Sequence, residues 1–380
     1  MNTIEPIKRR FWAPSLTSQF KLCPVPVHLD TYRGCVYDCA YCFARDFTEF
    51  SRRNRPPEQR RSTYLEGNRP DRLEKWMKAT LESDYDYEDA IGVAIKERIP
   101  MKIGATSDPF PPIESKEKIT RDVLKVFHKY DYPVEIQTKN PKGLVKVARE
   151  FIDDKPNWTL AVTLISTDSE FIKVCEPNAP SPQRRLSDIK TLTDMGLPVM
   201  VKCQPAIWPK IMDDLPDIIE KIDNVGVWAF LIQGLKVRIS MPKKEQAIMQ
   251  KIGDYLGYDI RERYKRAGRV NENYEIEMEH RLEYCDLSGR LCKDRGIKFF
   301  NSDKFLCKGD GVECCGTEKL RNYKIWGNSY RSKIFGHQDN ESEVLGKCKV
   351  NFTRHSRKTK HLTMDAVCNG LFNSKQTTLF

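Results

Sequence analysis

The sequence lacks any long apolar run. None of its segments approaches the ~20 apolar residues that a helix needs to span a bilayer. The N-terminal segment MNTIEPIKRRFWAPS carries basic residues but no apolar signal core. Internal repeats are also absent. We therefore expect a cytoplasmic protein with no membrane partner.

Length and positive charge are both substantial. The 380 residues exceed the size of one usual compact core, which favours one large catalytic domain with appendages. The net charge of +11 at pH 7 favours a polyanionic partner, because lysine and arginine release condensed counterions from a phosphate backbone. A basic surface that only maintains solubility is the alternative explanation.

Cysteine is abundant in a sequence that has no secretion signal. The 13 cysteines are therefore expected to be reduced, and reduced thiols are more often metal ligands or catalytic groups than disulfide partners. Three of them lie close together near the N-terminus, and five fall between Cys285 and Cys315. This clustering favours metal binding.

From Met101 onward, strand-like and helix-like segments alternate. The predicted strands are MKIGATSDP, PVEIQTKN, WTLAVTLIS, LPVMVKCQPAI and VGVWAFLIQGL. Apolar strands separated by helices need both faces covered, which predicts a parallel sheet or barrel whose strand ends face an active site. The polar residues at those ends are Thr106, Ser107, Asp108, Thr138, Lys139, Gln204 and Pro205, although Ser, Asp and Pro are also common in simple turns.

The remaining segments differ in composition. We expect an irregular lead-in over 1–30, a barrel over 31–235 with an insertion at 51–100, a helical and cysteine-rich region over 236–318, and a basic extension over 319–380. Within the insertion, residues 51–75 are rich in arginine and have almost no apolar periodicity. This composition predicts a surface segment that binds a partner.

The first cysteine group has the spacing CxxxCxxC, in the segment DTYRGCVYDCAYCFARDF. Thiolates are the soft ligands of iron–sulfur clusters, and Cys35, Cys39 and Cys42 would leave one iron of a [4Fe-4S] cubane without a protein ligand. Such an iron can chelate S-adenosylmethionine, whose reductive cleavage gives a 5′-deoxyadenosyl radical. A zinc site with Cys23 or His28 as fourth ligand is the alternative.

The segment YRGCVYDCAYCFAR resembles the cluster loop of the spore photoproduct lyase-like branch of the radical S-adenosylmethionine (radical SAM) superfamily. The likeness extends through GATSDPF, VEIQTKN and CEPNAPSPQRRL, within residues 20–235. It implies an α/β fold, a partial (β/α)6 TIM-type radical SAM barrel with a cysteine-rich C-terminal extension. It also implies contacts with S-adenosylmethionine around Ser107, Lys139 and Thr163, and Asp108 and Gln204 at strand ends are further candidates.

The chain departs from this family pattern at two places. Where the family has a cysteine that returns hydrogen to the substrate radical, this chain has Ala105. Of the two aromatic positions of the family's radical relay, one is Tyr41 and the other is Phe43, which has no hydroxyl. Cys203 is a candidate substitute hydrogen donor, with a buried small apolar side chain as the alternative. We therefore nominate Tyr41 and Cys203 as catalytic residues.

The second cysteine group comprises Cys285, Cys292, Cys307, Cys314 and Cys315. Glycines between these residues allow sharp turns, which favours a metal site. An auxiliary iron–sulfur cluster, structural zinc and thiols without metal all remain open. Because adjacent cysteines do not easily bind one ion, one of the last two is expected to be free.

The leading hypothesis is a radical SAM enzyme that abstracts hydrogen from a nucleic-acid base, a pyrimidine in DNA, in repair or base modification. A reductase or a flavodoxin- or ferredoxin-type protein would supply the electron. The segments 51–75 and 319–380 are the candidate nucleic-acid surfaces, because lysine and arginine alternate with aromatic residues in the second. The alternatives are a peptide- or protein-modifying radical enzyme with an auxiliary cluster, and a non-enzymatic nucleic-acid-binding module.

Overall fold

The fold centres on one eight-stranded sheet. The computed structural model describes residues 7–17, 23, 25–45, 65–84, 89–303 and 314–326. The sheet order is β14-β10-β9-β8-β7-β6-β3-β2, and every neighbouring pair is parallel except β2 with β3. The strands are β2 (Ser15–Leu16), β3 (Val27–Leu29), β6 (Met101–Ile103), β7 (Val134–Thr138), β8 (Trp158–Thr163), β9 (Val199–Ala206), β10 (Ala229–Gly234) and β14 (Lys298–Asn301).

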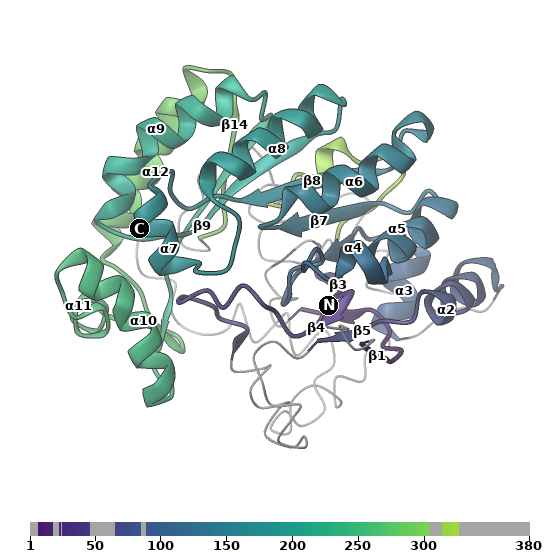
Figure 1. Cartoon of the computed structure of the whole chain (residues 1–380), viewed down its shortest axis with the longest axis horizontal. Helices are drawn as coiled ribbons and strands as arrows, with labels where there is room; N and C mark the ends of the chain where they lie inside the picture. Colours follow the sequence, from purple (N-terminus) through teal and green to yellow (C-terminus); the bar gives the residue numbers. More distant parts are fainter. Residues whose placement is uncertain are drawn as a thin grey trace, which may run out of the picture.

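Helices follow these strands and cover the outer face of the sheet (Figure 1). They are α4 (Glu114–Glu117), α5 (Ile119–Lys129), α6 (Pro141–Phe151), α7 (Ser169–Cys175), α8 (Pro182–Asp194), α9 (Lys210–Asn224) and α12 (Met278–Lys293). Each long helix buries one apolar stripe, as in α9, where Ile211, Leu215, Ile218 and Ile222 are buried at helical spacing. The alternation confirms the predicted α/β barrel.

The sheet extends beyond the predicted end of the barrel. Helix α12 packs against α9 and β14, and β14 pairs with β10, so the segment after residue 235 contributes another helix and strand to the same sheet. Before α12, the helices α10 (Lys243–Leu256) and α11 (Ile260–Ala267) lie beside a small sheet of β11 (Val237–Arg238), β12 (Arg269–Val270) and β13 (Asn273–Tyr274). The lead-in also contributes to the main sheet, through β3.

The described part of the insertion is mainly helical. It contains α2 (Pro70–Glu82) and α3 (Ala90–Lys96), and α2 packs against α5. A second small sheet joins β1 (Lys8–Arg9), β5 (Glu66–Gly67) and β4 (Tyr32–Arg33). Within the described ranges, no helix combines the length and apolar character that a membrane crossing requires.

The two faces of the sheet carry different side chains. Along β9, Val201 and Cys203 pack in the large core beneath the helices, whereas Met200 belongs to a separate apolar cluster on the inner face. Because side chains alternate along a strand, Lys202 and Gln204 share the inner face with Met200. The inner face therefore carries polar and charged groups, and the outer face carries most of the apolar core.

Gly104, directly after β6, approaches the neighbouring strand β7 more closely than a side chain would allow. Its φ is +89°, and a Cβ atom there would lie 2.3 Å from the carbonyl oxygen of Gln137. Gly196 also has a positive φ, +78°, but no heavy atom lies within 4 Å of its Cβ position. We expect Gly104→Ala to lower the free energy of unfolding by about 3 kcal/mol and Gly196→Ala by about 1 kcal/mol. Urea denaturation measures both, and equal losses would contradict the assigned close contact.

Candidate active site

The first three cysteines lie on one loop, residues 34–45, which follows β4 and contains no strand. Contacts with two other elements fix the backbone of this cysteine loop. The amide of Ala40 donates to the carbonyl of Cys175, at the end of α7, at 2.8 Å. The hydroxyl of Tyr37 donates to the carbonyl of Phe110, after β6, at 2.8 Å. The loop is therefore held at the carboxyl ends of the strands.

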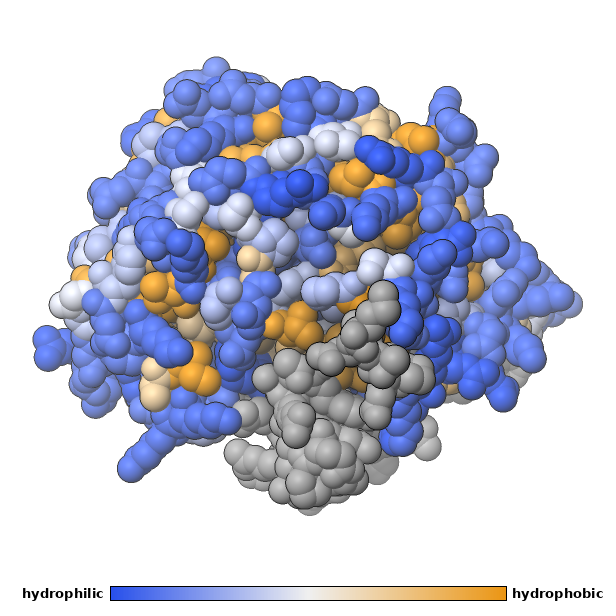
Figure 2. All heavy atoms as spheres, viewed as in Figure 1, coloured by the Kyte–Doolittle hydropathy of each residue, from blue (hydrophilic) through white to orange (hydrophobic). Residues whose placement is uncertain are grey.

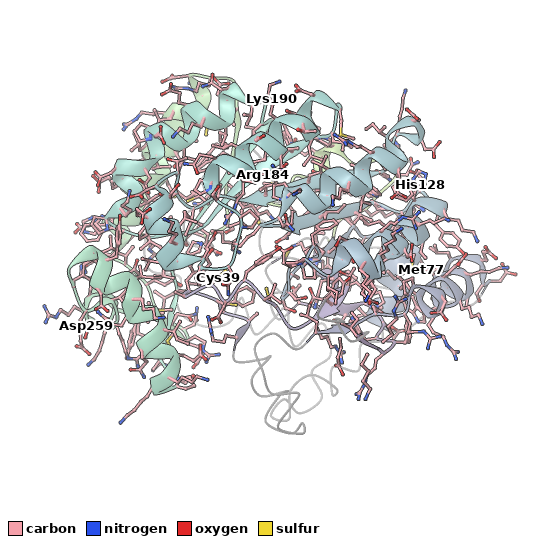
Figure 3. All side chains as sticks on the ribbon, in the orientation of Figure 1. Cys39, Met77, His128, Arg184, Lys190 and Asp259 are labelled. Carbon is pink, nitrogen blue, oxygen red and sulfur yellow. The ribbon has the colours of Figure 1, made fainter. Side chains whose placement is uncertain are left out.

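The thiols of this loop lie in one electrostatic neighbourhood. Figure 3 shows Cys39 on the loop where it crosses the front of the molecule. Burial and the nearby Asp108 carboxylate raise the pKa of Cys35 to about 11. Burial also raises the pKa of Cys39, against the opposing effect of the Lys139 ammonium. Cys42 has an electrostatic effect on the pKa of each of the other two thiols, so all three are near one another.

The donor set fits a cubane cluster better than a single ion. Among the residues that the structure describes, no three Cys, His, Asp or Glu side chains are grouped as ligands of one metal ion. In a cubane each thiolate binds a different iron, so three cysteines need not converge on one point. The proposed fourth zinc ligands are engaged elsewhere: Cys23 Sγ accepts from Lys102 Nζ at 3.1 Å, and His28 Nε2 lies 3.4 Å from Ser15 Oγ.

Two predicted cofactor contacts hold the backbone around this loop. The Asp108 carboxylate accepts hydrogen bonds from the Thr138 hydroxyl at 2.8 Å and from the Lys139 amide at 2.6 Å. It therefore ties the end of β7 to the segment that follows β6. The Ser107 hydroxyl donates to the carbonyl of Tyr32, immediately before the cysteine loop. Both residues lie at the site, and both have partners within the protein.

Three further predicted contacts lie at the carboxyl ends of β7, β8 and β9. Burial opposes the charge on Lys139, but the neighbouring Cys39 and Glu176 outweigh it and raise the lysine pKa. Thr163 is half-buried at the end of β8, and its neighbour in the β9 register is an inward-facing lysine. Gln204 is exposed on the inner face, and its amide donates to Gln233 on β10. The fold thus brings all three to one edge of the sheet.

The two nominated catalytic residues have structural positions. Cys203 lies on the outer face of β9, fully buried in the helix-covered core, with its Sγ 3.8 Å from the carbonyl oxygen of Ile165. Side chains alternate between the two faces of a strand, so the Cys203 side chain points away from the inner face. This position corrects the nomination of Cys203 as a hydrogen donor to a substrate on the inner face. The Tyr41 hydroxyl donates to the Glu176 carboxylate, so its proton is held in a protein hydrogen bond.

A buried ion pair that the sequence reasoning missed supports the site. The side chains of Glu176 and Arg185 are 0% exposed and paired with each other. Arg185 also donates to the carbonyls of Pro180 and Thr163, each at 2.9 Å. Burial opposes ionisation of Glu176, but Arg185 and Lys139 outweigh it and lower its pKa. The segment CEPNAPSPQRRL contained both residues, but nothing local distinguishes Arg185 from its exposed neighbour.

The structure does not bring the second cysteine group together. Cys285 and Cys292 lie on the buried face of α12, in the core beneath the helices. Cys315 is buried in another cluster, with Cys23 and Val25, and Cys314 packs against it. Cys307 lies outside the described residues. One metal centre that includes both α12 and the Cys314–Cys315 pair is therefore not supported.

The two predicted nucleic-acid surfaces lie largely outside the described residues. The structure describes 65–75 of the first segment and 319–326 of the second. In the latter, Arg321 and Lys324 form ion pairs with Asp131 and Glu97, at 2.8 Å and 2.5 Å. The described part of the basic extension therefore packs on the barrel.

Comparison with known proteins identifies the fold. No protein-family model matches the chain. An uncharacterized protein of Mycobacterium tuberculosis is 23% identical over 283 residues, which cover 71% of this chain and 76% of that protein. A cysteine-to-alanine variant of spore photoproduct lyase with dinucleoside spore photoproduct superposes with a TM-score of 0.50 at 13% identity, over 75% of this chain and 80% of that one. Streptococcus suis SuiB bound to its precursor peptide SuiA gives a TM-score of 0.45 at 11% identity, over 75% and 50% of the chains. The chain therefore shares the fold of spore photoproduct lyase, the fold that the sequence resemblance implied.

The buried ion pair generates a stability prediction. Glu176→Gln leaves Arg185 buried without a counter-charge, so we expect the free energy of unfolding at pH 7 to fall by about 3–5 kcal/mol. Because the folded-state pKa of Glu176 is lowered, its contribution is present above the unfolded pKa of about 4.3 and is lost as the pH falls through the folded value. The gap between wild type and variant should therefore narrow on acidification.

Glu170→Gln on α7 is the matched control. Its pair with Lys173 spans 2.7 Å, but both side chains are 70% exposed, so the expected loss is below about 1 kcal/mol. Urea denaturation of both variants at pH 7 and at pH 4 tests the assignment. Equally small losses for the two variants would show that the buried pair does not stabilise the fold.

Proposed function

We propose that this chain is a radical SAM enzyme whose cysteine loop holds a [4Fe-4S] cluster through Cys35, Cys39 and Cys42. The observation that carries the proposal is the position of these three thiols, on one loop at the carboxyl ends of parallel strands, beside an ammonium group. Active sites of barrel enzymes lie at that end of the sheet. When bound, such a cluster supplies the electron that cleaves S-adenosylmethionine to a 5′-deoxyadenosyl radical.

The side chains around the loop have separate tasks in this proposal. The Lys139 ammonium offers a charged donor to the carboxylate of S-adenosylmethionine, because it remains protonated beside Cys39. The Thr163 hydroxyl and the Gln204 amide offer neutral hydrogen bonds on the inner face. Asp108 and the Glu176–Arg185 pair position the backbone, because their polar groups bind other parts of the chain.

For the substrate we infer a nucleic acid, a pyrimidine base in DNA in the most specific form of the proposal. Its support on the described surface is a groove of about 420 Å³ between α4, α5 and α6. Phe110, Pro111 and Val147 form its apolar part, Lys118, Arg121, Lys142 and Lys146 form its basic part, and Glu114 and Glu150 also line it. Figure 2 shows apolar surface among hydrophilic side chains over the same helices. We call this the lysine groove.

The charges of the lysine groove favour a polyanion. Within the described residues, Lys118, Lys142 and Lys146 are exposed and form no ion pair, whereas Arg121 pairs with Glu150 at 2.7 Å. Unpaired ammonium groups gain by contacting phosphates and releasing their counterions. The groove also adjoins the site. Phe110 lines the groove, and its carbonyl accepts a hydrogen bond from the hydroxyl of Tyr37 in the cysteine loop. A strand that enters the site could therefore cross the groove.

The reaction is proposed as far as hydrogen abstraction from a base carbon. Ala105 has no thiol whose weakly bound hydrogen atom could return to a substrate radical, so a lyase-type closing step is not assigned to that position. A peptide-modifying reaction is the competing outcome of the substrate test. A flavodoxin- or ferredoxin-type donor is proposed as the source of the electron.

The cluster assignment predicts a loss of iron. The Cys35→Ala/Cys39→Ala/Cys42→Ala variant, reconstituted without oxygen, should lose about four iron atoms and four sulfides per chain and should form no 5′-deoxyadenosine with dithionite. Cys175→Ala is the control, since Cys175 is a buried cysteine at the end of α7 that the proposal leaves out. Full iron content in the triple variant, or zinc in the wild type, would overturn the assignment.

The substrate assignment predicts salt-dependent binding. Lys118→Glu/Lys142→Glu/Lys146→Glu should weaken binding of a single-stranded oligonucleotide and reduce the slope of log K against log salt by roughly 2, at ~0.7 per lost phosphate contact. The control is Lys8→Glu/Lys243→Glu/Lys293→Glu, which makes the same charge change at exposed lysines outside the groove and outside the segments 51–75 and 319–380.

Both variants are measured by fluorescence anisotropy at several salt concentrations. Equal loss in the two variants would indicate nonspecific attraction rather than docking in the groove. Turnover stimulated by peptides but not by DNA would replace the nucleic-acid substrate with a peptide, and would leave the radical SAM assignment unaffected.

A further inference from the structure

The amino ends of the barrel strands are closed by the segment 314–326, here called the capping segment. The Asn157 side chain, before β8, exchanges two hydrogen bonds with the backbone of Arg321, at 3.0 Å and 2.8 Å. Gly316 lies against Trp228, before β10, and Glu318 pairs with Lys298 at the start of β14. In Figure 1 this yellow-green segment lies behind β8. Its first residues, Cys314 and Cys315, enter the barrel from this end.

Three charged side chains are buried on the inner face next to these cysteines. Lys202, on β9, pairs with Glu135, on β7, and both are almost fully buried. Gln137 donates to the same carboxylate, at 3.0 Å and 2.9 Å. Lys102, on β6, is also buried and donates to Cys23 Sγ at 3.1 Å. The cluster therefore contains two ammonium groups and one carboxylate.

Among the residues that the structure describes, the groups near Lys102 and Lys202 that can supply a second negative charge are thiols. Buried charges are stable only when they are paired and hydrogen-bonded. The negative groups that act on Lys102 and on Lys202 are the Glu135 carboxylate and the thiols of the cysteines around them. One thiolate shared between the cysteines would balance the second ammonium. A thiolate, rather than a thiol, is the form that attacks oxidants.

The two sulfurs that can share this charge are in contact. The side chains of Cys23 and Cys315 pack together with Val25 in one small buried cluster. The Cys23 thiol also lies 3.2 Å from the carbonyl oxygen of Val25. Cys314, from the same segment as Cys315, packs against this cluster. The contact joins the lead-in before β3 to the capping segment after β14.

We propose that Cys23 and Cys315 form a thiol redox site that reacts with hydrogen peroxide or another small hydroperoxide and closes an internal disulfide. The thiolate of one cysteine attacks the peroxide oxygen, the O–O bond breaks, and a sulfenic acid and hydroxide form. The thiol of the other cysteine then attacks that sulfur, and an S–S bond forms as water leaves with the thiol proton. Two electrons pass from the two sulfurs to the peroxide. The site is separate from the cysteine loop.

The test is carried out on the full chain in the Cys35→Ala/Cys39→Ala/Cys42→Ala background, and then on the wild type. After treatment with hydrogen peroxide in stoichiometric steps, free thiols are alkylated and peptides are mapped by mass spectrometry. We expect a peptide that links Cys23 to Cys315, with loss of two free thiols. Cys23→Ser and Cys315→Ser should each abolish it, and Cys203→Ser should not. Because this background has no cluster ligands, the result is independent of the proposed radical chemistry.

The role of the ammonium groups is tested by rate. Lys102→Met should slow formation of the disulfide roughly tenfold, because the thiolate loses its donor, and Lys102→Arg should restore most of the rate. Circular dichroism verifies that both variants fold. The proposal is overturned if Cys23 and Cys315 remain reduced while other cysteines oxidise, if the disulfide joins Cys314 to Cys315 instead, or if a folded Lys102→Met variant reacts at the wild-type rate.

Discussion

The site depends on how a loop without regular structure is held in place. The cysteine loop has no strand of its own, so its position is determined by groups that other elements present. The most constrained of these is the Glu176–Arg185 pair, which is fully buried and also binds Tyr41 from the loop. A charged pair in such a position has a fixed geometry, because any displacement leaves a charge without a partner. Rigidity at the loop thus originates in α7, α8 and the segment between them.

The parallel sheet explains why residues distant in sequence meet there. Parallel strands place all their carboxyl ends at one edge, so Asp108, Lys139 and Thr163 become neighbours although helices separate them in the chain. The same geometry creates a second set at the amino ends, where Lys102 and Glu135 are adjacent in register. One inner face therefore has two chemically distinct ends, one beside the cysteine loop and one beneath the capping segment.

The sequence was sufficient for the strands of the barrel, and less so for side-chain partners. The apolar segments around β7, β8 and β10 were predicted because both faces of those strands are buried. The period of two in VMVKCQPA would have placed Cys203 opposite Lys202 and Gln204, but a sulfur near a strand end suggested chemistry instead. Arg185 could not be distinguished from Arg184, since only helix packing makes one buried and the other exposed. The cysteines of α12 and of the capping segment are close in sequence, yet the turn of the helix and the intervening β14 direct them to separate clusters.

The position of the capping segment has a consequence for synthesis on the ribosome. The strands β3 to β10 emerge well before residues 314–326, so the sheet can pair while its amino edge is still open to water. During that interval Lys102, Glu135 and Lys202 remain hydrated and need no partner. Their full burial therefore awaits a segment that is synthesised late, after every strand of the sheet.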